Sequence, residues 1–184
     1  METFDFKDRQ QIIELIGRAD DNQATLDLLS HFSELKSRRT PMFLDKSDFE
    51  AILKWKLRNQ FGRQLKLREL NTDEIIQKIT RVVFEIEHPS SDYETELKIK
   101  LLTSLKGVEI PIASAILTLT NPDKYAVVDF RVWRQFFGIT KSYYTITDYL
   151  KYLSMIKNLS IKYGLKLQQI DMAIWQYDIE QNMP

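Results

Sequence analysis

The chain has 184 residues, with 26 Lys+Arg, 26 Asp+Glu, two His and no Cys, so its formal net charge is zero. This length suits one compact domain over residues 1–184, with room for two small lobes. The lack of cysteine excludes a disulfide framework, a thiolate zinc site and a Cys-ligated iron–sulfur cluster. No apolar run approaches the ~20 residues that a membrane span needs. We therefore expect a cytoplasmic protein with no membrane partner.

Charge is segregated along the sequence although the total is neutral. Residues 36–68 carry 10 basic and 3 acidic side chains, a net charge of +7, and residues 98–168 carry 11 and 4, again +7. The other stretches are acidic, at −5 for residues 1–35, −6 for 69–97 and −3 for 169–184. The folded molecule can therefore present a basic face, although lysines placed in solvent along long helices give the same counts.

Few residues interrupt the chain, which has only five Gly and five Pro, and this favours long helices. We expect helices over about residues 5–19, 23–38, 48–61, 72–87, 92–105, 112–120, 130–138, 147–163 and 167–181. Residues 125–128, Tyr-Ala-Val-Val, form one short run that looks extended. The predicted fold class is all-α.

Local patterns support several of these helices. Ser47 followed by Glu50, and Ser91 followed by Glu94, are capping-box patterns that predict two helix starts. Between residues 72 and 87 the apolar residues recur at three- and four-residue spacing, which predicts one buried face made of Ile75, Ile76, Ile79, Val82, Val83 and Ile86.

The stretch from 102 to 117 predicts a tight turn between two helices. Gly107 suits a left-handed residue that ends the first helix, and the fixed φ of Pro111 suits the first turn of the second. Backbone N–H groups at such a turn can bind a phosphate. An ordinary helical hairpin without a ligand gives the same pattern, and from geometry alone it is the better interpretation.

Two stretches around this hairpin match a known pattern. They are Leu105-x-Gly107-Val108-x-x-x-x-Ala113 and residues 125–133, which run through Asp129. Together they resemble the helix-hairpin-helix superfamily of DNA glycosylases, most strongly over residues 98–138 and more weakly from 48 to 178. The Trp55-Lys56-x-Arg58 helix and residues 170–177 are similar to an uncharacterised bacterial branch without an iron–sulfur cluster.

The resemblance implies a fold and a reaction. The fold is two helical lobes with a cleft, in which a helix-hairpin-helix lobe covers about residues 48–138 and the terminal helices complete the second lobe. The reaction is that of a monofunctional DNA base-excision glycosylase, which hydrolyses the N-glycosidic bond of a damaged or modified base. Pro111 stands where bifunctional members have their lysine nucleophile, so strand-cleaving lyase activity is expected to be absent.

Asp129 is the candidate catalytic carboxylate. Glycosidic hydrolysis builds positive charge on the sugar, and a carboxylate near that carbon stabilises it. Asp129 stands where the resemblance places this group, at the start of the predicted helix 130–138. An Asp at such a junction also commonly caps the helix, and the two roles are compatible.

The other candidates belong to a DNA surface and a base pocket. Duplex DNA bound with modest affinity is the expected partner, and the candidate contacts are Lys106, Gly107, Val108, Glu109, Lys56 and Arg58. An extruded base needs aromatic surfaces, for which Trp55 and Trp133 are the candidates, although a buried aromatic is more often core. His31 and His88 stand alone, so no metal ligand set is expected, and no cofactor.

Two alternatives stay open because of Glu109. This residue replaces the second glycine of the hairpin pattern, and its carboxylate can repel the phosphate that the hairpin would bind. One alternative is a non-catalytic helix-hairpin-helix module that binds DNA. The other is a helical protein-interaction domain that has lost DNA binding.

Overall fold

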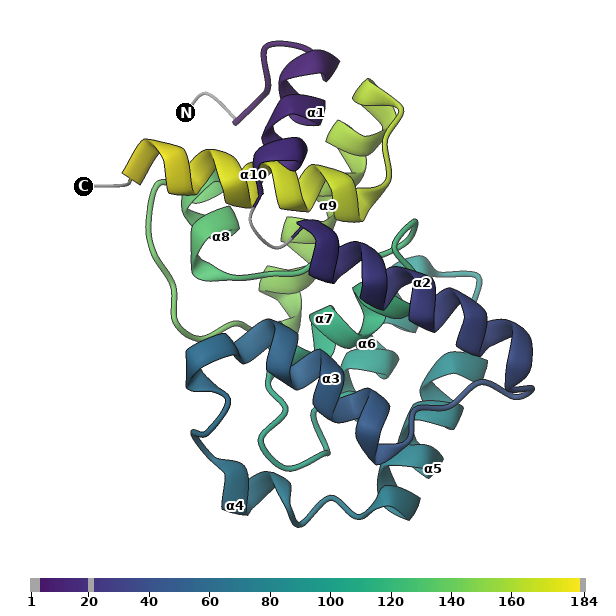
Figure 1. Cartoon of the computed structure of the whole chain (residues 1–184). Coiled ribbons are helices and arrows are strands. Elements are labelled where there is room, and N and C mark those ends of the chain that lie inside the picture. Colours follow the sequence, from purple (N-terminus) through teal and green to yellow (C-terminus); the bar gives the residue numbers. More distant parts are fainter. Residues whose placement is uncertain (1–3, 20–21, 183–184) are drawn as a thin grey trace.

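The protein is all-helical in the computed structural model (Figure 1), which describes residues 4–19 and 22–182. Its helices are α1 (Arg9–Arg18), α2 (Asn22–Arg38), α3 (Lys46–Leu57), the 3-10 helix η1 (Arg58–Gln60), α4 (Leu65–Arg68), α5 (Asp73–Glu85), α6 (Ser91–Leu102), α7 (Ile110–Thr120), α8 (Phe130–Phe137), α9 (Ile146–Tyr163) and α10 (Leu167–Asn182). The described residues contain no β-strand. The predicted all-α class is therefore confirmed.

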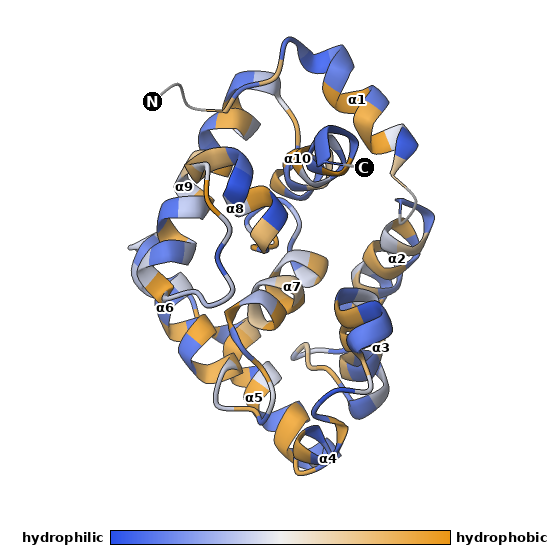
Figure 2. Cartoon of the chain, turned by 90° about the vertical axis from the view of Figure 1, so that its left-hand side faces the viewer, coloured by the Kyte–Doolittle hydropathy of each residue, from blue (hydrophilic) through white to orange (hydrophobic). Residues whose placement is uncertain are grey.

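Helix α7 forms the centre of the molecule. Every residue of this helix except Pro111 is buried, and the helix packs against α2, α3 and α6. Figure 2 shows α7 in the middle, with α2 and α3 on one side and α6 on the other. A second group of contacts forms around α10, which packs against α1, α8 and α9. In Figure 1 most of this second group lies above α7, while α3 to α6 lie around and below it.

All of the predicted helices are present, but two begin at other residues than the capping patterns indicated. The N-cap of α3 is Asp45, which forms a capping box with Asp48, so the prediction of Ser47 and Glu50 was wrong. The Ser47 hydroxyl instead donates to Asp45 Oδ1 at 2.6 Å and supports that cap. The N-cap of α6 is Ser90, one residue before the predicted Ser91.

The region after α3 differs most from the prediction. The helix expected to run to residue 61 ends at Leu57, because Arg58 has a φ of +47° and interrupts the α-helical backbone. The short helices η1 and α4 follow, neither of which was predicted. The helix expected to end at 105 stops at Leu102. The predicted buried face of α5 is also incomplete, since Ile75 and Val82 are 45% and 48% exposed.

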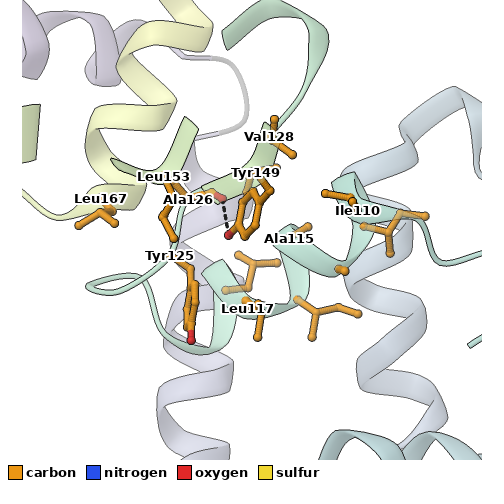
Figure 3. Close-up of a cluster of buried hydrophobic side chains, with 14 of the residues drawn as sticks. Ile110, Ala115, Leu117, Tyr125, Ala126, Val128, Tyr149, Leu153 and Leu167 are labelled. Atoms are coloured by element: carbon orange, nitrogen blue, oxygen red, sulfur yellow. Dashed lines mark hydrogen bonds between the residues drawn. The ribbon is translucent and has the colours of Figure 1, made fainter. Parts of the chain in front are cut away.

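Residues 125–129 connect α7 to α8 without helix or strand, and side chains satisfy their backbone. Val127 N donates to Asp171 Oδ2 at 3.0 Å, and Val128 N donates to Ser114 Oγ at 3.2 Å. The hydroxyls of Tyr149 and Tyr152 lie within hydrogen-bond distance of the carbonyls of residues 126 and 127. Figure 3 shows the Tyr149 bond among the packed apolar side chains. Buried backbone groups need such partners, so this connection follows a fixed path up to Asp129.

Across the described ranges, none of the helices combines the length and the apolar character that crossing a membrane requires.

Candidate functional site

Asp129 stands at the N-terminus of α8 with its two carboxylate oxygens in different surroundings. Oδ1 accepts hydrogen bonds from the backbone N–H groups of Arg131 and Val132, at 2.9 and 3.2 Å. Oδ2 lies 3.5 Å from Nζ of Lys56, which α3 supplies. The side chain of Asp129 is 19% exposed and that of Lys56 is 13% exposed. Asp129 therefore caps α8 through one oxygen and keeps the other directed toward α3.

This ion pair borders two hollows. The main cavity has a volume of about 330 Å³ and lies between α3 with η1 on one side and α8 with α10 on the other. The adjoining groove, of about 600 Å³, is lined by Pro111 of α7 and by residues 140–142 after α8. The two hollows share five lining residues, namely Lys56, Leu57, Gln60, Asp129 and Phe130. Asp129 and Lys56 therefore stand where the two hollows meet.

Aromatic side chains line the main cavity from two helices. Trp55 comes from α3, and its indole N–H donates to Thr25 Oγ1 at 3.1 Å, which fixes the ring. Trp175 comes from α10 and carries two guanidinium groups near its ring, Arg58 at 4.7 Å and Arg131 at 5.8 Å from the ring centroid. Aromatic surfaces flanked by cations suit a planar ligand attached to phosphate.

Helix α10 contributes a stripe of four residues to this cavity. Gln168, Asp171, Met172 and Trp175 follow one another at the i, i+3, i+4 and i+7 spacing of a single helical face. The apolar spacing of the sequence does not indicate Gln168 and Asp171, because the stripe mixes polar and apolar residues. Their three-residue spacing, in register with Met172 and Trp175 on one helical face, is the signal that could have found them.

Asp171 is buried in the wall of the cavity, where its carboxyl group has few polar neighbours. Burial raises its pKa to about 7, and the negative charge of Asp129 adds to that effect. The hydrogen bonds from Tyr152 and from Val127 N, together with the charge of Lys56, act in the opposite direction and lower the pKa. The Tyr152 hydroxyl lies 2.7 Å from Asp171 Oδ1. A carboxyl group that titrates near neutral pH thus adjoins the candidate catalytic one.

The backbone turns sharply at Arg58, which the main cavity includes in its lining. A φ of +47° is unusual for a residue with a side chain and costs of order 1–3 kcal/mol. The turn ends α3 and carries the Arg58 guanidinium to the face of Trp175. Strained residues of this kind cluster at binding sites, where the rest of the fold holds them in place.

The hairpin adopts the predicted turn, with Gly107 at a φ of +72° and Pro111 in the first turn of α7. Neighbouring side chains cover part of it. The amide of Asn71 pairs with the backbone of Lys106, through N–H···O distances of 2.8 and 2.9 Å. A Cβ added to Gly107 would lie 2.7 Å from Cγ of Arg68. The hairpin therefore offers less free backbone to a phosphate than the sequence pattern indicates.

The structure brings some of the predicted site residues together and leaves others apart. Trp55, Lys56, Arg58 and Asp129 all line the main cavity. Trp133 lines neither hollow: it is 5% exposed and packs against Phe137 and Tyr144 in the core. The predicted hairpin contacts also lie outside the lining of both hollows; they are Lys106, Gly107, Val108 and Glu109. Pro111, at the start of α7, does line the adjoining groove.

Comparisons with known proteins leave the site to be interpreted from its own geometry. No family model, curated protein or solved structure matches the chain. Residues 4–19 and 22–182 also contain no group of three or more His, Cys, Asp or Glu side chains placed to hold a metal ion.

Proposed function

We propose that the protein is a monofunctional DNA base-excision glycosylase, with Asp129 as its catalytic carboxylate and the main cavity as its base pocket. The observation that carries the proposal is the position of Asp129, which has one oxygen fixed by α8 and the other at the junction of two hollows. The finer expectations, two helical lobes and binding of duplex DNA, belong to this proposal.

The reaction requires stabilisation of a positively charged sugar. As the bond to the base breaks, positive charge develops on the anomeric carbon and its ring oxygen. Asp129 Oδ2 provides negative charge there, and the two backbone N–H groups on Oδ1 hold the carboxylate without further reorganisation. Water attacks the sugar and completes the hydrolysis, so the products are the free base and an abasic site.

Lys56 has an electrostatic role in this proposal. Its ammonium balances the charge of Asp129 at 3.5 Å, and it also borders the adjoining groove, where it can meet a phosphate next to the extruded nucleotide. Pro111 occupies the position at which the family has its lysine nucleophile, so this proposal includes no Schiff base. The proposed reaction therefore leaves the DNA strand uncut.

The experiment uses Asp129→Asn together with a matched helix cap, Asp8→Asn. Asn caps a helix about as well as Asp, so both variants should keep their stability within about 1 kcal/mol. Asp8 caps α1 through a 2.8 Å bond to Gln11 N, outside both hollows. Base release from duplexes carrying deaminated, oxidised or alkylated bases should fall by at least about 10²-fold in Asp129→Asn and stay unchanged in Asp8→Asn.

The outcome is measured as abasic sites after single-turnover incubation of each duplex. Wild-type protein that releases no base from any duplex of the set contradicts the proposal. Equal release by the wild type and Asp129→Asn contradicts the assignment of Asp129, even if the protein is an enzyme.

A non-catalytic binding module is the second candidate, and the hairpin favours it. Asn71 occupies the backbone of Lys106, Arg68 lies over Gly107, and the Glu109 carboxylate makes no cap bond to α7. These features weaken the phosphate contact that a glycosylase of this type would use. A module of this kind would bind DNA, or a protein partner, with the same affinity before and after Asp129→Asn.

A further inference from the structure

We propose that Gln168 selects the ligand of the main cavity, a neutral planar heterocycle in which a ring N–H lies next to a carbonyl oxygen. This inference deepens the proposed function and rests on it for the claim that the heterocycle is part of DNA. The direct evidence is the side-chain amide of a largely buried residue, which lines the cavity and makes no hydrogen bond to another described residue.

Gln168 is 8% exposed and lines the main cavity, yet its carboxamide makes no hydrogen bond to any described residue. Its backbone N–H donates to Pro122 O at 3.2 Å, so the residue has a fixed place at the start of α10. In the described part of the chain, only Arg68 Nε and Trp133 Nε1 are side-chain atoms that are both shielded from solvent and without a hydrogen-bond partner, so the Gln168 amide is open to solvent. A ligand in the cavity can therefore replace water at both ends of this amide.

The carboxamide determines the kind of edge that it can bind. It presents one acceptor, the carbonyl oxygen, next to one donor, the amide N–H. The complementary partner is a cyclic amide, whose ring N–H donates while the adjacent carbonyl accepts. Two parallel hydrogen bonds then form in the plane of a ring that has Trp55 and Trp175 available as aromatic surfaces. Deaminated purines, uracil and oxidised guanine all carry such an edge.

The charges of the cavity favour a neutral ring over a cationic one. The guanidiniums of Arg58 and Arg131 already lie near the face of Trp175, at 4.7 and 5.8 Å. A cationic alkylated base stacked on this indole would lie beside both of them, and like charges at short distance repel. The aromatic surface that could attract a cation is thus occupied by cations of the protein itself.

The experiment measures binding of free bases, so it requires neither DNA nor catalysis. The probes are 9-methylhypoxanthine, 1,9-dimethylhypoxanthine, which lacks the ring N–H, and 1,9-dimethyladenine, which is protonated at neutral pH. The proteins are the full-length wild type, Gln168→Leu, and Gln181→Leu as a control on the exposed end of α10. Affinity is measured by titration calorimetry and the midpoint of thermal unfolding by calorimetric scanning.

We expect wild type and Gln181→Leu to bind 9-methylhypoxanthine at least about tenfold more tightly than either other probe. Gln168→Leu should lose this preference and unfold at about the same temperature, because the carboxamide makes no hydrogen bond to another described residue and leucine is of similar size. An unchanged preference in Gln168→Leu overturns the proposal. So does a large fall in its unfolding temperature, which would show that Gln168 has a structural partner.

The result is independent of the glycosylase assay. Selective binding of 9-methylhypoxanthine with no base release from any duplex would support the cavity assignment and contradict the proposed function. Base release that persists while no probe binds, or while the cationic probe binds most tightly, would contradict the role of Gln168 and leave the role of Asp129 intact.

Discussion

Asp129 and Asp171 line the same cavity, but their surroundings give the two carboxyl groups different properties. Asp129 is partly exposed and has two backbone N–H groups, a helix N-terminus and the Lys56 ammonium beside it. Asp171 is buried and accepts one backbone N–H and one tyrosine hydroxyl. The two carboxyl groups therefore differ in burial and in hydrogen-bond partners, although they line one cavity.

The raised pKa of Asp171 makes stability depend on pH. The pKa of Asp171 is about 7 in the folded chain, against an ordinary value of 3.8. Between pH 3.8 and about pH 7, the folded chain therefore keeps a proton on Asp171 that the unfolded chain has released. The free energy of unfolding should therefore fall as pH rises through this range. Because each pKa unit corresponds to about 1.36 kcal/mol, the fall is on the order of 4 kcal/mol. The groups that face Asp171 are Tyr152, Asp129 and Lys56.

The variant Asp171→Asn tests this dependence. Asn can accept from Val127 N and donate to the Tyr152 hydroxyl, so it imitates the protonated acid. Urea unfolding at pH 5, 6, 7 and 8 should show a smaller loss of stability with rising pH in Asp171→Asn than in wild type. Asp92→Asn, at an exposed position of α6, should match the wild type at every pH. Parallel curves for Asp171→Asn and wild type would contradict the raised pKa.

At the residue scale the sequence located part of the site. Asp129, Trp55, Lys56 and Arg58 were predicted, since a motif or local spacing identified each of them, and all four line the cavity. Gln168 and Asp171 were missed, because only the packing of α10 against α8 and α9 brings them there. Trp133 was placed in a pocket by its position one turn after Asp129, but its side chain lies in the core.

At the scale of elements, the connection of residues 125–129 is the part that positions the site. Its side-chain partners come from α7, α9 and α10, namely Ser114, Tyr149, Tyr152 and Asp171. The sequence indicated an extended run there but not its partners, because hydrogen bonds between distant elements leave no local pattern. The helices themselves could be predicted, because capping residues and apolar spacing are patterns within a few residues of the sequence.

The hairpin gives a prediction at the same scale. Gly107 and Gly164 both have a positive φ, of +72° and +62°, but only Gly107 has a close neighbour at its missing Cβ, Cγ of Arg68 at 2.7 Å. Gly164→Ala should cost about 1–2 kcal/mol from backbone strain alone. Gly107→Ala should cost more, because the Arg68 side chain must also shift.

Urea unfolding of the two glycine variants measures this difference. Gly17→Ala serves as a control in α1, where no atom lies within 4 Å of the added Cβ, and it should be neutral or stabilising by up to ~1 kcal/mol. Equal losses of stability in Gly107→Ala and Gly164→Ala would contradict the close contact between Arg68 and Gly107.

At the scale of the whole molecule, the neutral net charge conceals a local arrangement. The two +7 stretches supply Lys56, whose Nζ lies 3.5 Å from Asp129, and Arg58 and Arg131, whose guanidiniums lie near the ring of Trp175 in the wall of the main cavity. Segment counting predicted that basic residues gather, but not that these three would turn inward. The cations therefore act within the site, and we expect DNA binding that is modest and weakened by salt.

The central claim is that Asp129 stabilises a positively charged sugar, and the most direct test is binding of a charged abasic analogue. Duplexes with a cationic pyrrolidine or a neutral tetrahydrofuran in place of the sugar differ in charge at the reacting position. Wild-type protein should bind the cationic duplex at least about tenfold more tightly, and Asp129→Asn should lose that preference while binding the neutral duplex as before. Equal preference for the cationic duplex in both proteins would contradict the account.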